Sequence, residues 1–180
     1  MSVLGKGSMT KFTFATSEEG FDNHIETSIR GYNNLWNDVV SMSKYFVEDN
    51  TNVIDVGCSS GKMLKAMMKQ NNEHVPHTNY IGVEIESDFS DGHTEDLMSK
   101  EWNNLSYEVR DARVYDFVCC SLVTSLFTLQ FMPPKDRKDT IRNIYKGLND
   151  GGAFIFAEKS FSCNPKICLL YTSDAADDRN

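Results

Sequence analysis

The chain has 180 residues, of which 40% are apolar and 24% charged, which is the composition of about one ordinary globular domain. A chain of this length buries roughly two thirds of its extended surface, so it can form a full core without disulfides or a structural metal. Its 18 basic and 26 acidic residues leave a net charge of −8, which argues against direct binding to nucleic acid. No apolar run approaches the ~20 residues that span a bilayer, and the N-terminus lacks the pattern of a signal peptide. We therefore expect a soluble protein with no membrane partner.

Five cysteines are present, an odd number, with neither a C-x-x-C pair nor the spacing of a zinc site: Cys58, Cys119, Cys120, Cys163 and Cys168. This pattern predicts reduced thiols, a cytoplasmic location and no metal site.

The chain begins with residues 1–17, which carry little pattern and are expected to form a disordered arm. Helical spacing then predicts a helix ahead of the sheet, with its apolar face on Leu35, Val39, Met42 and Phe46. From Asn52 onward, runs rich in β-branched and aromatic residues alternate with helical segments, which is typical of a parallel sheet covered by helices. The fold class is therefore predicted to be α/β. Strands are expected at 52–56, 80–85, 105–109, within 115–125 and at 153–157, each buried on both faces.

Two helices are predicted between these strands. The first starts just after Gly61 and places a core stripe on Met63, Leu64, Met67 and Met68. The second follows Pro133 and runs through Leu148, and residues 149–152 are expected to end it before the fifth strand.

The periodicity fades after Lys159, and residues 168–180 fit neither a strand nor an amphipathic helix. Their sequence resembles translated sequencing-adapter read-through, so we expect a truncated gene that lacks the elements after the fifth strand. The resulting free sheet edge and apolar helix faces favour aggregation or the pairing of two copies into a homodimer.

The strongest local signal is the segment 53–61, VIDVGCSSG, an apolar strand that ends in an acid and a glycine-bracketed turn. Glycines let a ligand approach the backbone, and the N–H groups at the start of the next helix favour a negatively charged group. The alternative is a tight strand-to-helix connection without a ligand. Ser59 stands where G-x-G-x-x-G has its second glycine, so a dinucleotide is disfavoured and a nucleoside without phosphates fits better.

Acids follow the next two strands. Glu84 ends the second strand, where nucleotide-binding α/β sheets place a carboxylate that accepts from ribose hydroxyls. Asp111 follows the third strand and could accept from an adenine amino group while the next backbone N–H, that of Ala112, donates to the ring. Taken alone, Asp111 is more often a surface turn residue. Because ligands of open α/β sheets bind at the carboxyl ends of the strands, Gly57, Glu84 and Asp111 together predict one site.

The motifs at 55–61, 82–84, 111–112 and 151–156 resemble those of class I S-adenosyl-L-methionine (SAM)-dependent methyltransferases. More specifically, the segments 21–22, 31–34, 127–137, 144–148 and 157–159 resemble the carboxy-SAM synthase branch. The similarity covers roughly residues 21–161. It implies a Rossmann-like fold, with a mostly parallel sheet flanked by helices, over a domain at 18–167.

The resemblance implies SAM as the cofactor and assigns ten residues to it. Tyr32 would reach over the methionine end, although a packing role for this ring is the alternative. The turn would hold the amino-acid part, and the strand ends would hold the ribose and adenine: Gly57, Cys58, Ser59, Glu84, Ile85, Asp111 and Ala112. Leu126 stands where the family has an asparagine, after a strand that is longer than in the family, and Ser125 or Thr124 could take the place of that asparagine. The family's arginine for the added carboxylate lies downstream of the fifth strand, beyond the interpretable sequence.

The implied reaction is loss of carbon dioxide from prephenate and conversion of the SAM methyl group into a carboxymethyl group. In the family another enzyme uses the product to modify a tRNA wobble uridine, so this chain need not touch RNA. A conventional SAM-dependent methyltransferase of a small molecule and an inactive SAM-binding fragment are the alternatives. None of these requires a metal or a protein nucleophile, so no catalytic residue is assigned. The histidines lie in polar stretches and are expected to have no chemical role: His24, His74, His77 and His93.

Overall fold

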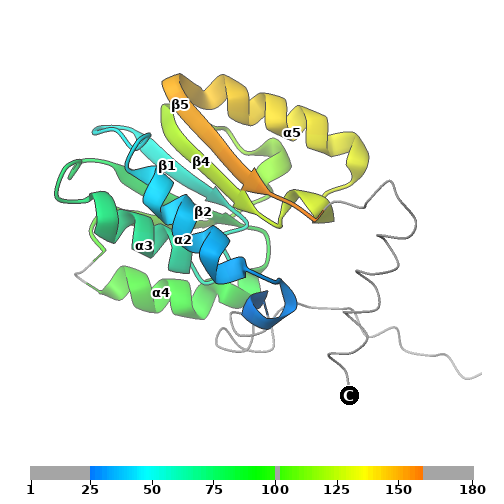
Figure 1. Ribbon diagram of the computed structural model, residues 1–180, viewed down its shortest axis with the longest axis horizontal. Helices are drawn as coiled ribbons and strands as arrows, with labels where there is room; N and C mark the ends of the chain where they lie inside the picture. Colours follow the sequence, from blue (N-terminus) through cyan, green and yellow to red (C-terminus); the bar gives the residue numbers. More distant parts are fainter. Residues whose placement is uncertain (1–24, 100–101, 160–180) are drawn as a thin grey trace, which may run out of the picture.

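A five-stranded, fully parallel sheet forms the centre of the computed structural model, which describes residues 25–99 and 102–159 (Figure 1). The strand order is β3-β2-β1-β4-β5. The strands are β1 (Asn52–Val56), β2 (Asn79–Glu84), β3 (Leu105–Val109), β4 (Cys120–Leu126) and β5 (Leu148–Ala157). The predicted α/β class is confirmed. The arm at 1–17 and the tail at 168–180 lie outside the described residues.

Helices cover both faces of the sheet (Figure 1). They are α2 (Tyr32–Ser43), α3 (Lys62–Asn71), α4 (Ser90–Met98) and α5 (Pro134–Gly147), with short 3₁₀ turns η1 (Ser87–Phe89), η2 (Ala112–Val114) and η3 (Leu129–Phe131). The α2 and α3 helices pack on one face, and Ile144 of α5 packs on the other. In the described part of the chain no helix combines the length and the apolar character that crossing a membrane requires.

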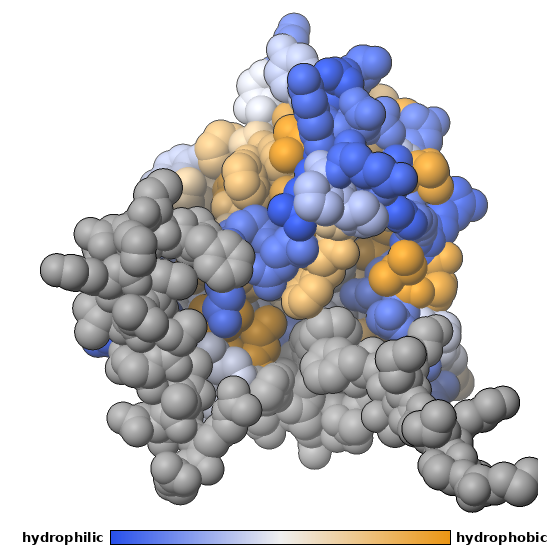
Figure 2. Space-filling model, turned by 90° about the vertical axis from the view of Figure 1, so that its right-hand side faces the viewer, coloured by the Kyte–Doolittle hydropathy of each residue, from blue (hydrophilic) through white to orange (hydrophobic). Residues whose placement is uncertain are grey.

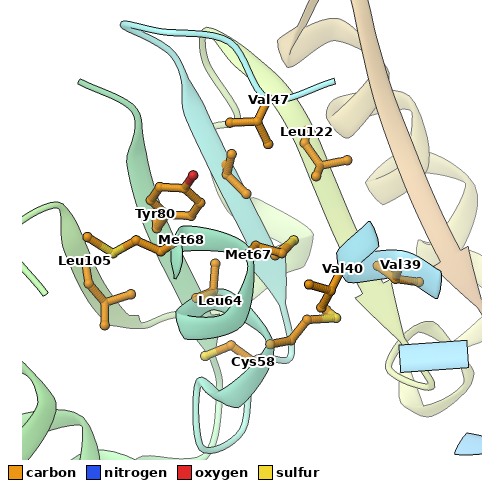
Figure 3. Packing of buried hydrophobic residues seen from close by; sticks show 12 residues of the cluster. Val39, Val40, Val47, Cys58, Leu64, Met67, Met68, Tyr80, Leu105 and Leu122 are labelled. Carbon is orange, nitrogen blue, oxygen red and sulfur yellow. The ribbon is translucent and has the colours of Figure 1, made fainter. Parts of the chain in front are cut away.

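The methionine stripe of α3 is core, as predicted. Met63, Leu64, Met67 and Met68 are buried and belong to one apolar cluster with Val53 of β1. Figure 3 shows Leu64, Met67 and Met68 within this cluster. Side chains alternate across the strands, so Ile54 and Val123 face the opposite layer with α5.

The predicted apolar face of α2 is partly wrong. Val39 is buried, and Leu35 and Phe46 pack against the same core, but Met42 is 44% exposed and the helix ends at Ser43, before Phe46. The buried face is rotated because Ser43 turns inward, where its hydroxyl donates to the Val40 carbonyl at 2.6 Å and accepts from Asn71 Nδ2 at 2.9 Å.

The expectation that every strand is buried on both faces holds for the central strands and fails at the edges. Val109 of β3 and Phe156 of β5 are each 52% exposed, because within the described residues each of these strands has a neighbour on one side only.

Residues 149–152 do not form a separate turn, which corrects the predicted start of the fifth strand. The α5 helix ends at Gly147, and β5 begins directly at Leu148. Cys120 pairs with Leu148 and Leu122 with Ala153, so the intervening residues form an irregularity within the ladder. Gly151, with φ at +84°, supplies the left-handed backbone that such an irregularity needs.

Among the described cysteines, Cys58, Cys119 and Cys120 are free thiols. Cys163 and Cys168 lie outside the described residues.

Candidate ligand-binding site

The turn after β1 is built on left-handed backbone. Gly57 and Gly61 have φ of +74° and +70°, and Ser59 between them has φ of +47°. A Cβ at Gly57 would overlap the side chain of Thr128, and one at Gly61 would overlap the ring of Tyr107. Glycine is therefore required at both ends of the turn, and α3 can begin directly after it.

Glu84 ties this turn to the end of β2. Its Oε2 accepts from the backbone N–H of Ser59 at 3.0 Å, and its Oε1 accepts from the N–H groups of Ile85 at 2.8 Å and Glu86 at 3.0 Å. The residue is buried. A carboxylate offers about four acceptor positions, so Glu84 retains capacity for a further donor from a ligand.

Asp111 is engaged by an arginine two residues along the chain. Arg113 donates to it through its backbone N–H at 2.9 Å and through Nη2 at 2.6 Å, and its Nη1 reaches Asp136 at 3.1 Å. The Arg113 guanidinium holds the pKa of Asp111 below its usual value. The predicted role of this carboxylate as an acceptor for a ligand amine assumes that it is free, whereas in the structure it belongs to an ion pair with Arg113.

Three cavities adjoin one another at the carboxyl ends of the strands, and Gly57 lines all of them. A cavity of about 200 Å³ is lined by Gly57, Glu84, Ile85, Asp111 and Ala112, together with Arg113 and Phe131. A larger one of about 410 Å³ and a small one of about 50 Å³ are both lined by Gly57 and Ser59 of the turn. Figure 2 shows the side of the molecule toward which the strands run, where apolar patches lie between polar ones.

The structure brings together nine of the ten sequence-predicted residues. Tyr32 and Cys58 line the smallest cavity, and Ser59 and Leu126 line both the smallest and the largest. The ring of Tyr32 also lies 6.2 Å from that of Phe127, so it has a packing partner as well. Ser125 is the exception, because it is fully buried and lines none of the three cavities. Its hydroxyl has no hydrogen-bond partner among the residues that the structure describes.

Asp55 lies in β1, two residues before Gly57 of the turn, and lines the smallest cavity. The residue is 3% exposed, and the Thr124 hydroxyl donates to its Oδ1 at 2.7 Å. Burial raises the pKa of Asp55 to about 7, with a further contribution from the charge of Glu84 in the same direction, while the Thr124 hydrogen bond acts against both.

His93 of α4 contacts the backbone of the turn after β1, a contact that the sequence does not indicate. Its Nε2 lies 2.5 Å from the Ser59 carbonyl oxygen, which can only accept, so this nitrogen carries the proton. The ring stacks on Tyr107 with centroids 3.8 Å apart, and the Tyr107 hydroxyl donates to Asp96 at 2.9 Å. Because α4 reaches the turn only through the fold, no local pattern could have identified this residue.

Replacing His93 with phenylalanine should lower the free energy of unfolding by about 1–2 kcal/mol. The ring stack on Tyr107 is retained, but the Ser59 carbonyl loses its donor. Urea unfolding of the variant measures the effect, with the exposed His74 replaced by phenylalanine as the matched control. Equal stability of the two variants would show that the hydrogen bond contributes nothing.

Comparison with known proteins agrees with this geometry. A model of the methyltransferase domain family matches residues 54–154. The chain is 37% identical over 154 residues to the carboxy-S-adenosyl-L-methionine synthase of Staphylococcus epidermidis, covering 83% of this chain and 64% of that protein. The carboxy-S-adenosyl-L-methionine synthase of Actinobacillus succinogenes is 31% identical over 151 residues, covering 82% of this chain and 61% of that protein. The chain thus spans less than two thirds of the length of these curated relatives.

Solved structures share the fold at low sequence identity. The SAM-bound amino pentose methyltransferase of Micromonospora echinaspora has a TM-score of 0.58 and 18% identity, covering 82% of this chain and 58% of its own. The N-methyltransferase of Bradyrhizobium japonicum in complex with S-adenosyl-L-homocysteine has a TM-score of 0.56 and 14% identity, covering 79% and 67%.

A parallel sheet in this strand order, with a glycine turn after β1 and acids after β2 and β3, defines the fold class of the SAM-dependent methyltransferases. The family model matches residues 54–154, which is more than half of the chain, so the chain belongs to the methyltransferase domain family.

Proposed function

We propose that this chain binds SAM across the carboxyl ends of β1, β2 and β3 and acts as a SAM-dependent transferase. The observation that carries the proposal is that Gly57, Glu84 and Asp111, from three neighbouring strand ends, line one cavity. This cavity and the larger one share Gly57, Glu84 and Ile85, and pockets of several hundred Å³ are the usual size for ligands of this kind.

The residues present fit the cofactor. Gly57, Cys58 and Ser59 would hold its amino-acid part, and a Cβ at Gly57 would overlap the Thr128 side chain. Glu84 and Ile85 would hold the ribose, and the side of η2 at Asp111 and Ala112 would hold the adenine, with Tyr32 over the methionine end. When bound, SAM supplies a methyl group activated by a positively charged sulfur.

The finer proposal is a carboxy-SAM synthase-like activity that uses SAM and prephenate. It is supported by the names of the curated relatives and by the motif at 127–137, which belongs to the resemblance described above. In this proposal the chain acts in the cytoplasm, contacts no RNA itself, and its product feeds the modification of a tRNA wobble uridine by another enzyme. A homodimer remains an expectation from the sequence.

Isothermal titration of the 180-residue chain with SAM tests the coarser function. Saturable binding at one site per chain is expected, and NAD, whose pyrophosphate the turn disfavours, should not bind. Heat changes no larger than dilution would overturn the assignment.

Mass analysis of the nucleosides formed from SAM and prephenate tests the finer activity. Carboxylated SAM is the expected product. SAM binding without this product would reject the synthase reaction and leave a conventional methyltransferase or a SAM-binding fragment.

A further inference from the structure

Residues 127–132, which follow β4, line part of the proposed site. The Thr128 side chain occupies the space beside Gly57, and Thr128 and Phe131 line both larger cavities. The segment begins at Phe127, a non-glycine residue with φ of +58°, whose backbone N–H donates to the Ala157 carbonyl of β5 at 2.7 Å. Its only regular structure is the three-residue turn η3. Beyond these backbone contacts, two charged side chains from outside the segment bind its N–H and carbonyl groups.

Glu158, directly after β5, binds the N–H groups of this segment. Its Oε1 accepts from Leu129 at 2.8 Å and its Oε2 accepts from Gln130 at 3.0 Å. Burial raises the pKa of Glu158, with the two backbone hydrogen bonds acting in the opposite direction. Both carboxylate oxygens are thus committed to the backbone of the segment.

Arg137 of α5 binds the carbonyl groups of the same segment. Its Nε donates to the Met132 carbonyl at 3.0 Å, and its Nη2 donates to the Gln130 carbonyl at 2.9 Å. Glu158 therefore binds N–H groups at the start of η3, and Arg137 binds one carbonyl group within η3 and one directly after it. Each of these charge-assisted hydrogen bonds is stronger than a neutral one.

We propose that Glu158 and Arg137 are positioning residues that fix residues 127–132 beside Gly57 and so set the width of the opening that the ligand occupies. Neither side chain lines any of the three cavities, so each acts through the backbone it holds. The identity of the ligand, but not the clamp on the segment, rests on the proposed function.

Two substitutions remove the clamp with little change in side-chain volume. Glu158→Gln replaces one acceptor by an amide donor that faces a backbone N–H, and Arg137→Met removes both donors. Arg137→Lys restores the charge and a donor. Arg142→Met is the matched control, because Arg142 lies on the same helix, is exposed, and pairs with Asp139 rather than with the segment.

Two measurements distinguish a positioning role of Glu158 and Arg137 from a contribution to the stability of the fold alone. The first is the SAM dissociation constant at a temperature well below unfolding. The second is the ¹⁹F NMR spectrum of 4-fluorophenylalanine placed at position 131, where the side chain is 64% exposed. The parent and Arg142→Met should give one narrow resonance and equal affinity. Glu158→Gln and Arg137→Met should broaden or split the resonance and weaken SAM binding about tenfold, the equivalent of one charged hydrogen bond. Arg137→Lys should recover part of both.

A lower thermal midpoint with an unchanged ¹⁹F resonance and unchanged affinity in both variants would overturn the proposal and leave a purely structural role. If the parent itself fails to bind SAM, the proposed function fails, while the ¹⁹F comparison still decides whether the two residues position the segment.

Discussion

Replacing Glu84 with alanine is expected to weaken SAM binding by about 1.5–3 kcal/mol, which is roughly 10- to 150-fold in the dissociation constant. The variant loses the proposed acceptor for the ribose hydroxyls. It also leaves the N–H groups of Ser59, Ile85 and Glu86 without their present acceptor, so the turn after β1 loses its link to β2. Isothermal titration of parent and variant measures the loss.

The matched control is Glu95→Ala, because Glu95 is an exposed acid on α4 that lines none of the three cavities. It removes the same charge from the chain and should leave the affinity unchanged. An unaltered dissociation constant for Glu84→Ala would remove this residue from the site, and an equal loss in both variants would mean that net charge alone controls binding.

Replacing Asp55 with asparagine is expected to change the pH dependence of stability. The pKa of Asp55 rises from an ordinary value of 3.8 to about 7 on folding. A carboxyl group with a raised pKa stabilises the folded chain below its unfolded value and loses that contribution as the pH rises through the folded value. The parent should therefore lose about 1.4 kcal/mol per pH unit from this group between about pH 4 and pH 7.

Asparagine does not titrate, and its carbonyl can still accept from Thr124. The stability of Asp55→Asn relative to the parent should thus increase by about 2–3 kcal/mol between pH 5 and pH 8, as measured by urea unfolding at each pH. A difference that stays constant over this range would mean that Asp55 is ionised in the folded chain at pH 5, contrary to the effect of its burial.

The parts of the fold that the sequence predicts correctly are those controlled by local pattern. The bounds of β1 and β3 agree with the prediction, because each is a short run with β-branched or aromatic residues that polar residues flank on both sides. The start of α3 also agrees, since Gly61 can adopt the left-handed backbone before a helix. The rotation of α2 could not be predicted, because it depends on a hydrogen bond between Ser43 and Asn71 of a different helix.

In the site, too, the local sequence pattern predicts some residues, and contacts between distant segments determine the others. Gly57, Glu84 and Asp111 could be found because the carboxyl ends of parallel strands meet at one edge of the sheet. The supporting contacts could not, because they join distant segments: His93 reaches Ser59 across 34 positions, and Glu158 reaches Leu129 across 29. Chain spacing carries no information about such partners. The segments 127–137 and 157–159 belong to the resemblance, but it assigns no role to Glu158 and does not pair the two segments.

The most direct test of the account is a titration of the ¹⁵N-labelled chain with SAM, followed by the backbone amide resonances. Chemical-shift changes should concentrate at Gly57, Ile85 and Ala112, whose amides lie at the ends of β1, β2 and β3. SAM that binds while perturbing amides elsewhere, or that perturbs none, would contradict a ligand lying across the three strand ends.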